Sequence, residues 1–186
     1  QLESEGRSED FVMGFEESYG YLAGTHARDK DAVVASMLIC EMAAYYKAQG
    51  KTLIDVMNGL YDEFGYYCNT VQSYTFEGAS GMEKMAAIMD GLRVNKPSSF
   101  AGYEVTKIDD YKTSKSTDVK TGEESEITLP KSNVLAYTLT DGNKVIVRPS
   151  GTEPKIKAYI TAIGTSEENA KQIAQKLLKN ADELMK

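Results

Sequence analysis

The sequence predicts an α+β protein in which an antiparallel C-terminal sheet is backed by helices and preceded by the helical end of an α/β domain. In the first third of the chain, one short strand is followed by two helices with recognisable caps. The remainder has five strand-like stretches, and only one helix separates them before a final amphipathic helix. The last three of these strands are joined by short turns, which is typical of antiparallel pairing. We therefore expect one domain over residues 1–65 and a second over residues 66–186.

The composition is typical of a globular protein, with 41% hydrophobic and 26% charged residues. No apolar run is long enough to span a membrane and no signal peptide opens the chain, so we expect a cytoplasmic protein without a membrane partner. The net charge of −7 argues against a nucleic-acid partner, since such binding needs Lys and Arg to neutralise phosphates. Cys40 and Cys68 lack metal-ligand spacing and are expected to be buried free thiols. The chain starts with Gln1, which indicates processing or a segment of a longer polypeptide.

In the first domain, residues 11–13 read as a short strand that enters a glycine-flanked loop. Asp31 is a good N-cap for a helix over residues 32–49, which Gly50 ends. This helix is apolar on most sides, so we expect it to be buried.

A second helix of the first domain begins at Thr52 and Asp55, which have the spacing of a capping box. It ends near residue 64. Its expected inward face consists of Leu53, Val56, Met57 and Leu60.

In the second domain, residues 66–76 alternate and are rich in Tyr, Thr and Val, which favours a strand. A helix follows from Ser80, and a strand is expected over residues 103–109. Residues 111–132 are polar and predict a mobile excursion. The helix presents a face that indicates core packing rather than a ligand surface, made of Met82, Met85, Ala86, Met89 and Leu92.

The C-terminal part of the second domain is predicted with clear local signals. Strands over residues 133–140 and 143–148 form a hairpin through Asp141-Gly142, the favoured type I′ pair. A strand over residues 155–163 precedes the last helix, which begins at Ser166. The apolar face of that helix consists of Ala170, Ile173, Ala174, Leu177, Leu178, Ala181 and Leu184.

The turn before residue 155 has the character of an anion site. It reads Arg148-Pro-Ser150-Gly151-Thr152-Glu-Pro, with two hydroxyls, a glycine that lets the backbone turn its amides inward, and further cations at Lys155 and Lys157. Amides, hydroxyls and an arginine fork together suit a dianionic phosphate. The alternative is an ordinary β-turn with a solvated charge cluster.

Two stretches of the first domain also carry candidate site residues. Glu16 and Ser18 lie in the loop between Gly14 and Gly20, where a carboxylate and a hydroxyl can bind sugar hydroxyls. His26, Arg28 and Lys30 follow, a set of three potential cations that suits a phosphorylated ligand or acid–base chemistry. The alternatives are a helix-entry turn with solvated acids and a surface charge patch.

These motifs resemble the α-D-phosphohexomutases, the family of phosphoglucomutase and phosphomannomutase. Residues 15–20, Phe-Glu-Glu-Ser-Tyr-Gly, are similar to the sugar-recognition loop of the family's third domain. Residues 148–154 are similar to the phosphate-binding loop of its fourth domain, which has a TBP-like fold. The resemblance implies that residues 1–65 are the C-terminal part of domain 3 and that residues 66–186 are domain 4.

The resemblance also implies a mechanism, the interconversion of hexose 1-phosphate and hexose 6-phosphate through a bisphosphorylated sugar such as glucose 1,6-bisphosphate. Glu16 and Ser18 would contact the sugar, and Lys30 would be a possible proton-transfer group. His26 and Arg28 are weaker candidates. The non-reacting phosphate would be held by Arg148, Ser150, Gly151, Thr152 and Lys157.

The family's Thr-Ala-Ser-His-Asn-Pro phosphoserine loop and its Asp-x-Asp-x-Asp magnesium loop do not occur in the sequence. We therefore expect a C-terminal fragment that binds phosphosugar but is inactive alone, with magnesium bound by N-terminal domains of the same polypeptide. Alternatives are a stand-alone phosphosugar-binding or regulatory module, a structural domain, and a pentose phosphate as substrate.

Overall fold

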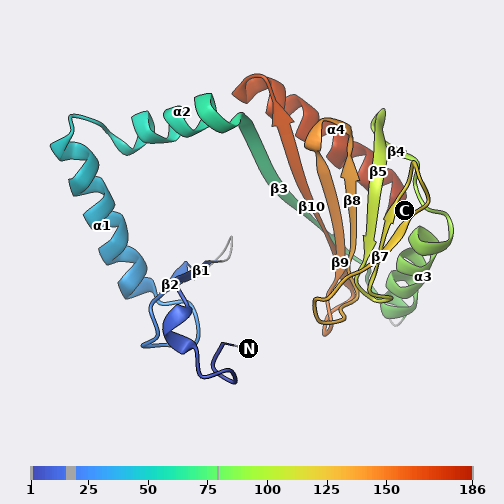
Figure 1. Ribbon diagram of the computed structural model, residues 1–186. Coiled ribbons are helices and arrows are strands. Elements are labelled where there is room, and N and C mark those ends of the chain that lie inside the picture. Colours follow the sequence, from blue (N-terminus) through green and yellow to red (C-terminus); the bar gives the residue numbers. More distant parts are fainter. Residues whose placement is uncertain (1, 16–19, 79, 186) are drawn as a thin grey trace. The chain divides into compact units, whose positions relative to one another are not determined.

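The computed structural model describes residues 2–15, 20–78 and 80–185. The chain divides into two compact units, Gln1–Leu60 and Tyr61–Lys186 (Figure 1).

The first unit contains one turn of 3-10 helix, a two-stranded hairpin and two helices. The antiparallel strands are β1 (Met13–Phe15) and β2 (Tyr21–Ala23), after the turn η1 (Ser8–Asp10). The helices are α1 (Ala32–Ala48) and α2 (Leu53–Phe64), the latter extending past residue 60.

Both helices of the first unit start at the predicted caps. Asp31 Oδ1 accepts hydrogen bonds from the amides of Val33 at 2.8 Å and Val34 at 3.3 Å. Thr52 donates its amide and hydroxyl to Asp55 Oδ2 at 2.8 and 2.7 Å, and the Asp55 amide donates back to Thr52 Oγ1 at 3.1 Å. Gly50 ends α1 with a φ of 71°, as a glycine after a helix allows.

The predicted burial of these helices is wrong. In α1 only Ala35 is buried, whereas Val33 is 79% and Met37 59% exposed, and Cys40 is exposed rather than a buried thiol. In α2, Leu53 and Val56 are half-buried, and the other predicted inward residues, Met57 and Leu60, are exposed. The reason is that the described part of this unit offers only the small β1–β2 hairpin, which is too narrow to cover an apolar helix.

The second unit is built on one antiparallel sheet in the order β3-β10-β9-β8-β5-β6-β7, with β4 paired to β5. Helix α3 (Gly81–Val94) follows β3, and α4 (Glu167–Leu184) ends the unit. The strands are β3 (Tyr66–Thr75), β4 (Ser99–Phe100), β5 (Tyr103–Asp110), β6 (Lys115–Asp118), β7 (Glu124–Glu126), β8 (Leu135–Leu139), β9 (Lys144–Pro149) and β10 (Lys155–Gly164). An α+β fold with a C-terminal antiparallel sheet is therefore confirmed. At the β8–β9 turn, Asp141 and Gly142 have φ values of 59° and 77°, as a type I′ turn requires.

The prediction of a mobile excursion over residues 111–132 is wrong, because β6 and β7 extend the sheet there. Only Ser116 in this stretch is buried, so the strands carry no apolar alternation that reveals them. Polar contacts hold the pair instead. Lys115 Nζ lies 2.7 Å from Glu124 Oε2, and the Thr121 amide donates to Asp118 Oδ1 at 2.8 Å.

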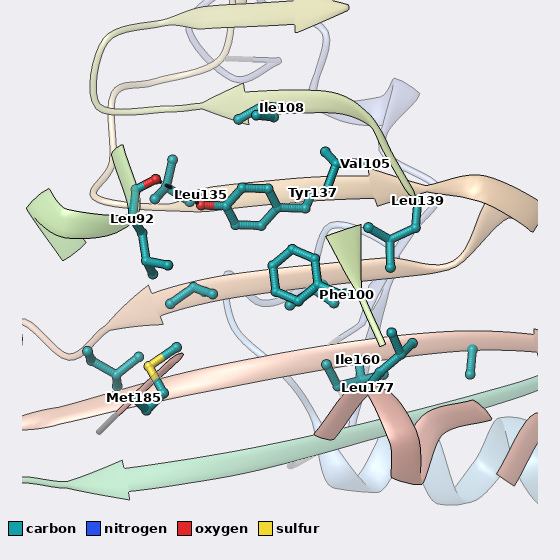
Figure 2. Packing of buried hydrophobic residues seen from close by; sticks show 14 of the residues in the cluster. Leu92, Phe100, Val105, Ile108, Leu135, Tyr137, Leu139, Ile160, Leu177 and Met185 are labelled. Carbon is teal, nitrogen blue, oxygen red and sulfur yellow. Dashed lines mark hydrogen bonds between the residues drawn. The ribbon is translucent and has the colours of Figure 1, made fainter. Parts of the chain in front are cut away.

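The core lies on the face of the sheet where α3 and α4 pack. Figure 2 shows Leu177 of α4 beside Ile160 of β10, and the ring of Phe100 facing that of Tyr137, with the ring centroids 5.1 Å apart. Burial raises the pKa of the Tyr137 hydroxyl. The predicted core face of α4 is confirmed, with Leu178 and Leu184 half-buried.

The methionine face of α3 is only partly confirmed. Met85, Met89 and Leu92 are buried in the core, whereas Met82 and Ala86 are exposed. The helix therefore buries a narrower face than its apolar residues indicate. Ser80, at the N-cap position, makes no side-chain capping bond.

Candidate phosphate-binding site

Strands β9 and β10 position the side chains of the predicted anion loop. Arg148 near the end of β9 lies directly opposite Lys157 of β10 in the antiparallel register. On β10, Ile156, Ala158 and Ile160 are buried against the core. Because successive side chains of a strand point to opposite faces, Lys155, Lys157 and Tyr159 lie on the other face of the sheet.

The loop itself is closed by its own backbone and by Ser150. The Ser150 amide donates to the Lys155 carbonyl at 2.7 Å. The Ser150 hydroxyl accepts from the amides of Thr152 at 3.4 Å and Glu153 at 3.3 Å, both long for hydrogen bonds. Such weakly held amides can exchange the hydroxyl for a more strongly accepting oxygen, as a phosphate offers.

The start of α3 supports the loop from behind. The Phe76 amide donates to the Pro154 carbonyl at 2.9 Å. A Cβ added at Gly81 would lie 2.1 Å from the Phe76 carbonyl oxygen and 3.0 Å from Pro154 Cβ. Sequence reasoning did not identify Gly81, because its close approach to the Phe76 carbonyl depends on the conformation of the β3–α3 connection, and its other contact, Pro154, is distant in the sequence.

A cavity of about 250 Å³ lies at the loop. Its lining carries three cations and one carboxylate, and the carboxylate of Glu153 lies 3.2 Å from Lys155 Nζ. Within residues 2–15, 20–78 and 80–185, no carboxylate forms an ion pair with Arg148 or Lys157. The cavity therefore has a net positive lining in an acidic chain. It is lined by Arg148, Pro149, Ser150, Gly151, Glu153, Lys155, Lys157 and Tyr159.

Four of the five predicted phosphate ligands line this cavity: Arg148, Ser150, Gly151 and Lys157. Thr152 is not among the lining residues, although its amide points to the Ser150 hydroxyl. Tyr159 was missed. Strand alternation from Lys155 and Lys157 is the signal that would have placed it on the same face.

The predicted cations of the first unit each have a carboxylate neighbour. His26 Nε2 lies 2.9 Å from Asp31 Oδ2, Arg28 Nη2 3.0 Å from Glu3 Oε1, and Lys30 Nζ 2.7 Å from Asp29 Oδ1. The hydrogen bond from His26 holds the pKa of Asp31 below its ordinary value, and the amides of Val34 and Val33 lower it further. The other predicted residues of this unit, Glu16 and Ser18, lie outside the described residues.

A second cavity, of about 340 Å³, lies in the first unit beside Arg28. Its lining includes the apolar side chains of Leu2, Phe11 and Leu22. The guanidinium of Arg28 is already bound to Glu3 and to the carbonyls of Thr25 and Ala27. This cavity therefore offers an anion less than the loop of the second unit does, despite its larger volume.

Neither a metal-binding cluster nor a membrane-spanning helix occurs in the part of the chain that the structure describes. There, no three His, Cys, Asp or Glu side chains gather as a metal-binding group. None of the helices described is both long and apolar enough to cross a membrane.

Comparison with known families assigns both units. The family profile for phosphoglucomutase/phosphomannomutase, alpha/beta/alpha domain III, matches residues 3–64. The profile for the C-terminal domain of the same family matches residues 92–180. The chain belongs to the phosphoglucomutase/phosphomannomutase family. The Arg148–Lys157 loop lies within the matched C-terminal domain of that family.

Individual relatives agree with this assignment. The chain is 39% identical over 168 residues to the phosphoglucomutase of Staphylococcus haemolyticus, covering 90% of this chain and 30% of the relative. It is 40% identical over 153 residues to that of Staphylococcus epidermidis, covering 82% and 28%. The chain thus spans less than a third of the length of these relatives.

A solved structure shows the same fold. The crystal structure of parafusin, a phosphoglucomutase from Paramecium, in an open form superimposes with a TM-score of 0.63 at 17% identity. The superposition covers 99% of this chain and 31% of the other.

Proposed function

We propose that this chain is the substrate-holding part of a phosphoglucomutase-type isomerase, and that the Arg148–Lys157 loop holds the phosphate that is not being transferred. The single observation that carries the proposal is the loop cavity, into which Arg148 and Lys157 project from opposite strands without a carboxylate partner in the described residues.

The reaction explains why such an anchor is useful. Interconverting hexose 1-phosphate and hexose 6-phosphate through a bisphosphorylated sugar requires that the intermediate bind in two orientations. An anchor built from a guanidinium, an ammonium and backbone amides recognises a phosphate whichever carbon carries it. Phosphoryl transfer otherwise depends on positioning and on charge neutralisation, which this anchor supplies at the non-reacting end.

The chemical step lies outside this chain in our proposal. The sequence has neither the phosphoserine loop nor the aspartate-rich magnesium loop of the family. We assign magnesium and the phosphoserine to other domains of the parent polypeptide, and glucose 1,6-bisphosphate to the substrate site of the complete enzyme. Glu16 and Ser18 are assigned to the sugar hydroxyls, and Lys30 to proton transfer. The chain alone then binds phosphosugar and shows no turnover in a coupled mutase assay.

A titration of the 186-residue chain with inorganic phosphate and with glucose 1-phosphate, followed by amide NMR, tests the anchor. We expect shifts centred on Ser150, Gly151 and Thr152 with both ligands. Arg148→Ala should weaken binding by about tenfold or more, because hydrogen bonds to charged groups contribute roughly 1.5–3 kcal/mol.

Lys144→Ala is the matched control. Lys144 is a cation on the same strand four residues before Arg148, and it does not line the cavity. It should leave both affinities within about twofold, as expected of an exposed charge outside the site. Equal losses in the two variants, or no shift in the loop with either ligand, would overturn the proposed anchor.

A further inference from the structure

We propose that Tyr159 makes this site selective for ring-bearing phosphate esters over free phosphate, by forming a floor against which the sugar ring of a bound phosphosugar packs. The inference rests on the proposed function, since it assumes that the loop holds the phosphate.

Tyr159 gives the cavity an aromatic part beside its cationic part. Tyr159 lines the cavity together with Arg148, Lys155 and Lys157, and it lies two residues beyond Lys157 on the same face of β10. It is half-buried, so its ring is fixed in part by neighbours while still facing the cavity.

The cross-strand neighbours of Tyr159 are apolar. In the register of the sheet, Tyr159 pairs with Ile146 of β9 on one side and with Val71 of β3 on the other. By contrast, the row beside the loop pairs Lys157 with Arg148 and Ser73. Moving two residues along β10, from Lys157 to Tyr159, therefore changes this face of the sheet from cationic and polar to aromatic and aliphatic.

The spacing between these rows suits a phosphate ester. Two residues of an antiparallel strand span about 7 Å, a length that the phosphate and ring of one phosphosugar can bridge. A free phosphate bound at the loop reaches only the cationic row. A phosphosugar bound in the same place extends over Tyr159.

The chemistry of a sugar matches that of a tyrosine floor. A pyranose has a face of C–H groups that packs on an aromatic ring, and its hydroxyls project from the edge of the sugar ring. Tyrosine provides a large apolar surface with one polar end. Ligand sites commonly combine such an apolar wall with a few placed polar groups.

The experiment compares two ligands and three variants in the 186-residue chain. Tyr159→Ala should weaken binding of glucose 1-phosphate about three- to tenfold, the range of an aromatic contact, and leave inorganic phosphate within about twofold. Tyr159→Phe keeps the ring and should retain most of the preference. Tyr67→Ala removes an exposed tyrosine that pairs with Ile163 near the other end of the same strand pair, and it should change neither affinity.

Amide NMR shifts of the unmutated chain provide a second readout, which does not depend on how a variant folds. Glucose 1-phosphate should shift the amides of Ile146, Val71 and Tyr159 in addition to the loop, whereas inorganic phosphate should shift the loop alone. Equal losses of both ligands in Tyr159→Ala, no loss of either, or a Tyr159→Phe variant as weak as the alanine variant would overturn the ring-packing inference.

Failure of this inference is distinguishable from failure of the proposed anchor. If the anchor is wrong, the unmutated chain shows no Arg148-dependent binding of either ligand. If only the tyrosine floor is wrong, phosphate and glucose 1-phosphate bind with the same dependence on Arg148, and Tyr159 makes no difference between them.

Discussion

The helices in the two units of this chain begin at equally clear sequence signals, but the two units bury very different amounts of apolar side chain. In the second unit, residues such as Ile156, Ala158 and Leu177 are completely buried between the sheet and its helices. In the first, α1 and α2 begin at well-formed caps, yet Ala35 is the only residue of these two helices that the structure shows as buried.

Helix formation and helix burial therefore depend on contacts at different distances along the chain. A cap such as Asp31 or Thr52 acts on amides two or three residues away. Burial needs a surface wide enough to cover the apolar side chains. Helix α4 finds it in β3 and β10, whereas the described part of the first unit has only β1 and β2 for α1.

A cavity made in the core of the second unit should destabilise the protein more than any other change considered below. Leu177→Ala removes a fully buried side chain and should lower the free energy of unfolding of that unit by about 2–5 kcal/mol. The control Ile54→Ala, in α2, removes a side chain that is 72% exposed and should cost well under about 1 kcal/mol. Urea unfolding followed by NMR peaks of each unit measures both values. Similar losses would contradict the contrast between the units.

A smaller and opposite pair of effects is expected when a methyl group is added to a helical glycine in each unit. A Cβ at Gly81 meets the carbonyl oxygen of Phe76, so Gly81→Ala should destabilise the second unit by about 1–3 kcal/mol. A Cβ at Gly59 in α2 meets nothing within 4 Å. Gly59→Ala should therefore stabilise α2 by up to about 1 kcal/mol, the propensity difference between the two residues.

The same unfolding measurement decides this prediction, with loop resonances as a second readout. Because Gly81 packs on Pro154, Gly81→Ala should also shift the amides of Ser150 and Gly151, whereas Gly59→Ala should not. A stable Gly81→Ala protein with an unchanged loop would show that the start of α3 does not support the candidate site.

The sequence was sufficient wherever the determining contact is local. The cap at Asp31, the start of the last helix at Ser166 and the turn at Asp141-Gly142 were predicted correctly, since the signal for each acts within a few residues. Strands β6 and β7 were not predicted, because their polar side chains carry no alternation and their pairing depends on β5.

The residues of the candidate site also differ in whether local sequence is enough to predict them. Arg148, Ser150, Gly151 and Lys157 belong to one contiguous motif and could be proposed from the sequence. The support from Gly81 requires the β3–α3 connection to meet the loop, and this meeting exists only in the folded sheet. Tyr159 is an intermediate case, since strand alternation predicts its face but not its apolar neighbours on β3 and β9.

The helix caps of the two units should also differ, by a smaller amount, in how they respond to acid. Asp31 caps α1 and Asp55 closes the capping box of α2. The pKa of each is below its ordinary value of 3.8, held down by the hydrogen bonds from His26 and Thr52 first. A carboxyl whose pKa is lowered by folding stabilises the fold above its ordinary pKa, and this contribution is lost as the pH falls through the folded value.

Helix α4 is capped by the Ser166 hydroxyl, which accepts from the Asn169 amide at 3.2 Å and does not titrate. Glu167 in its first turn also has a lowered pKa, but the cause is the side chain of Lys171 and not a bond to the helix amides. Lowering the pH from 7 to about 2 should therefore reduce helical Cα shifts at Val33 and Val34 before those at Asn169. Asp31→Asn keeps a good cap without a titrating group, so it should remove most of the acid response of α1. If α1 and α4 instead fray together, or if Asp31→Asn responds to acid as the unmutated chain does, then ionised cap residues do not distinguish the first unit from the second.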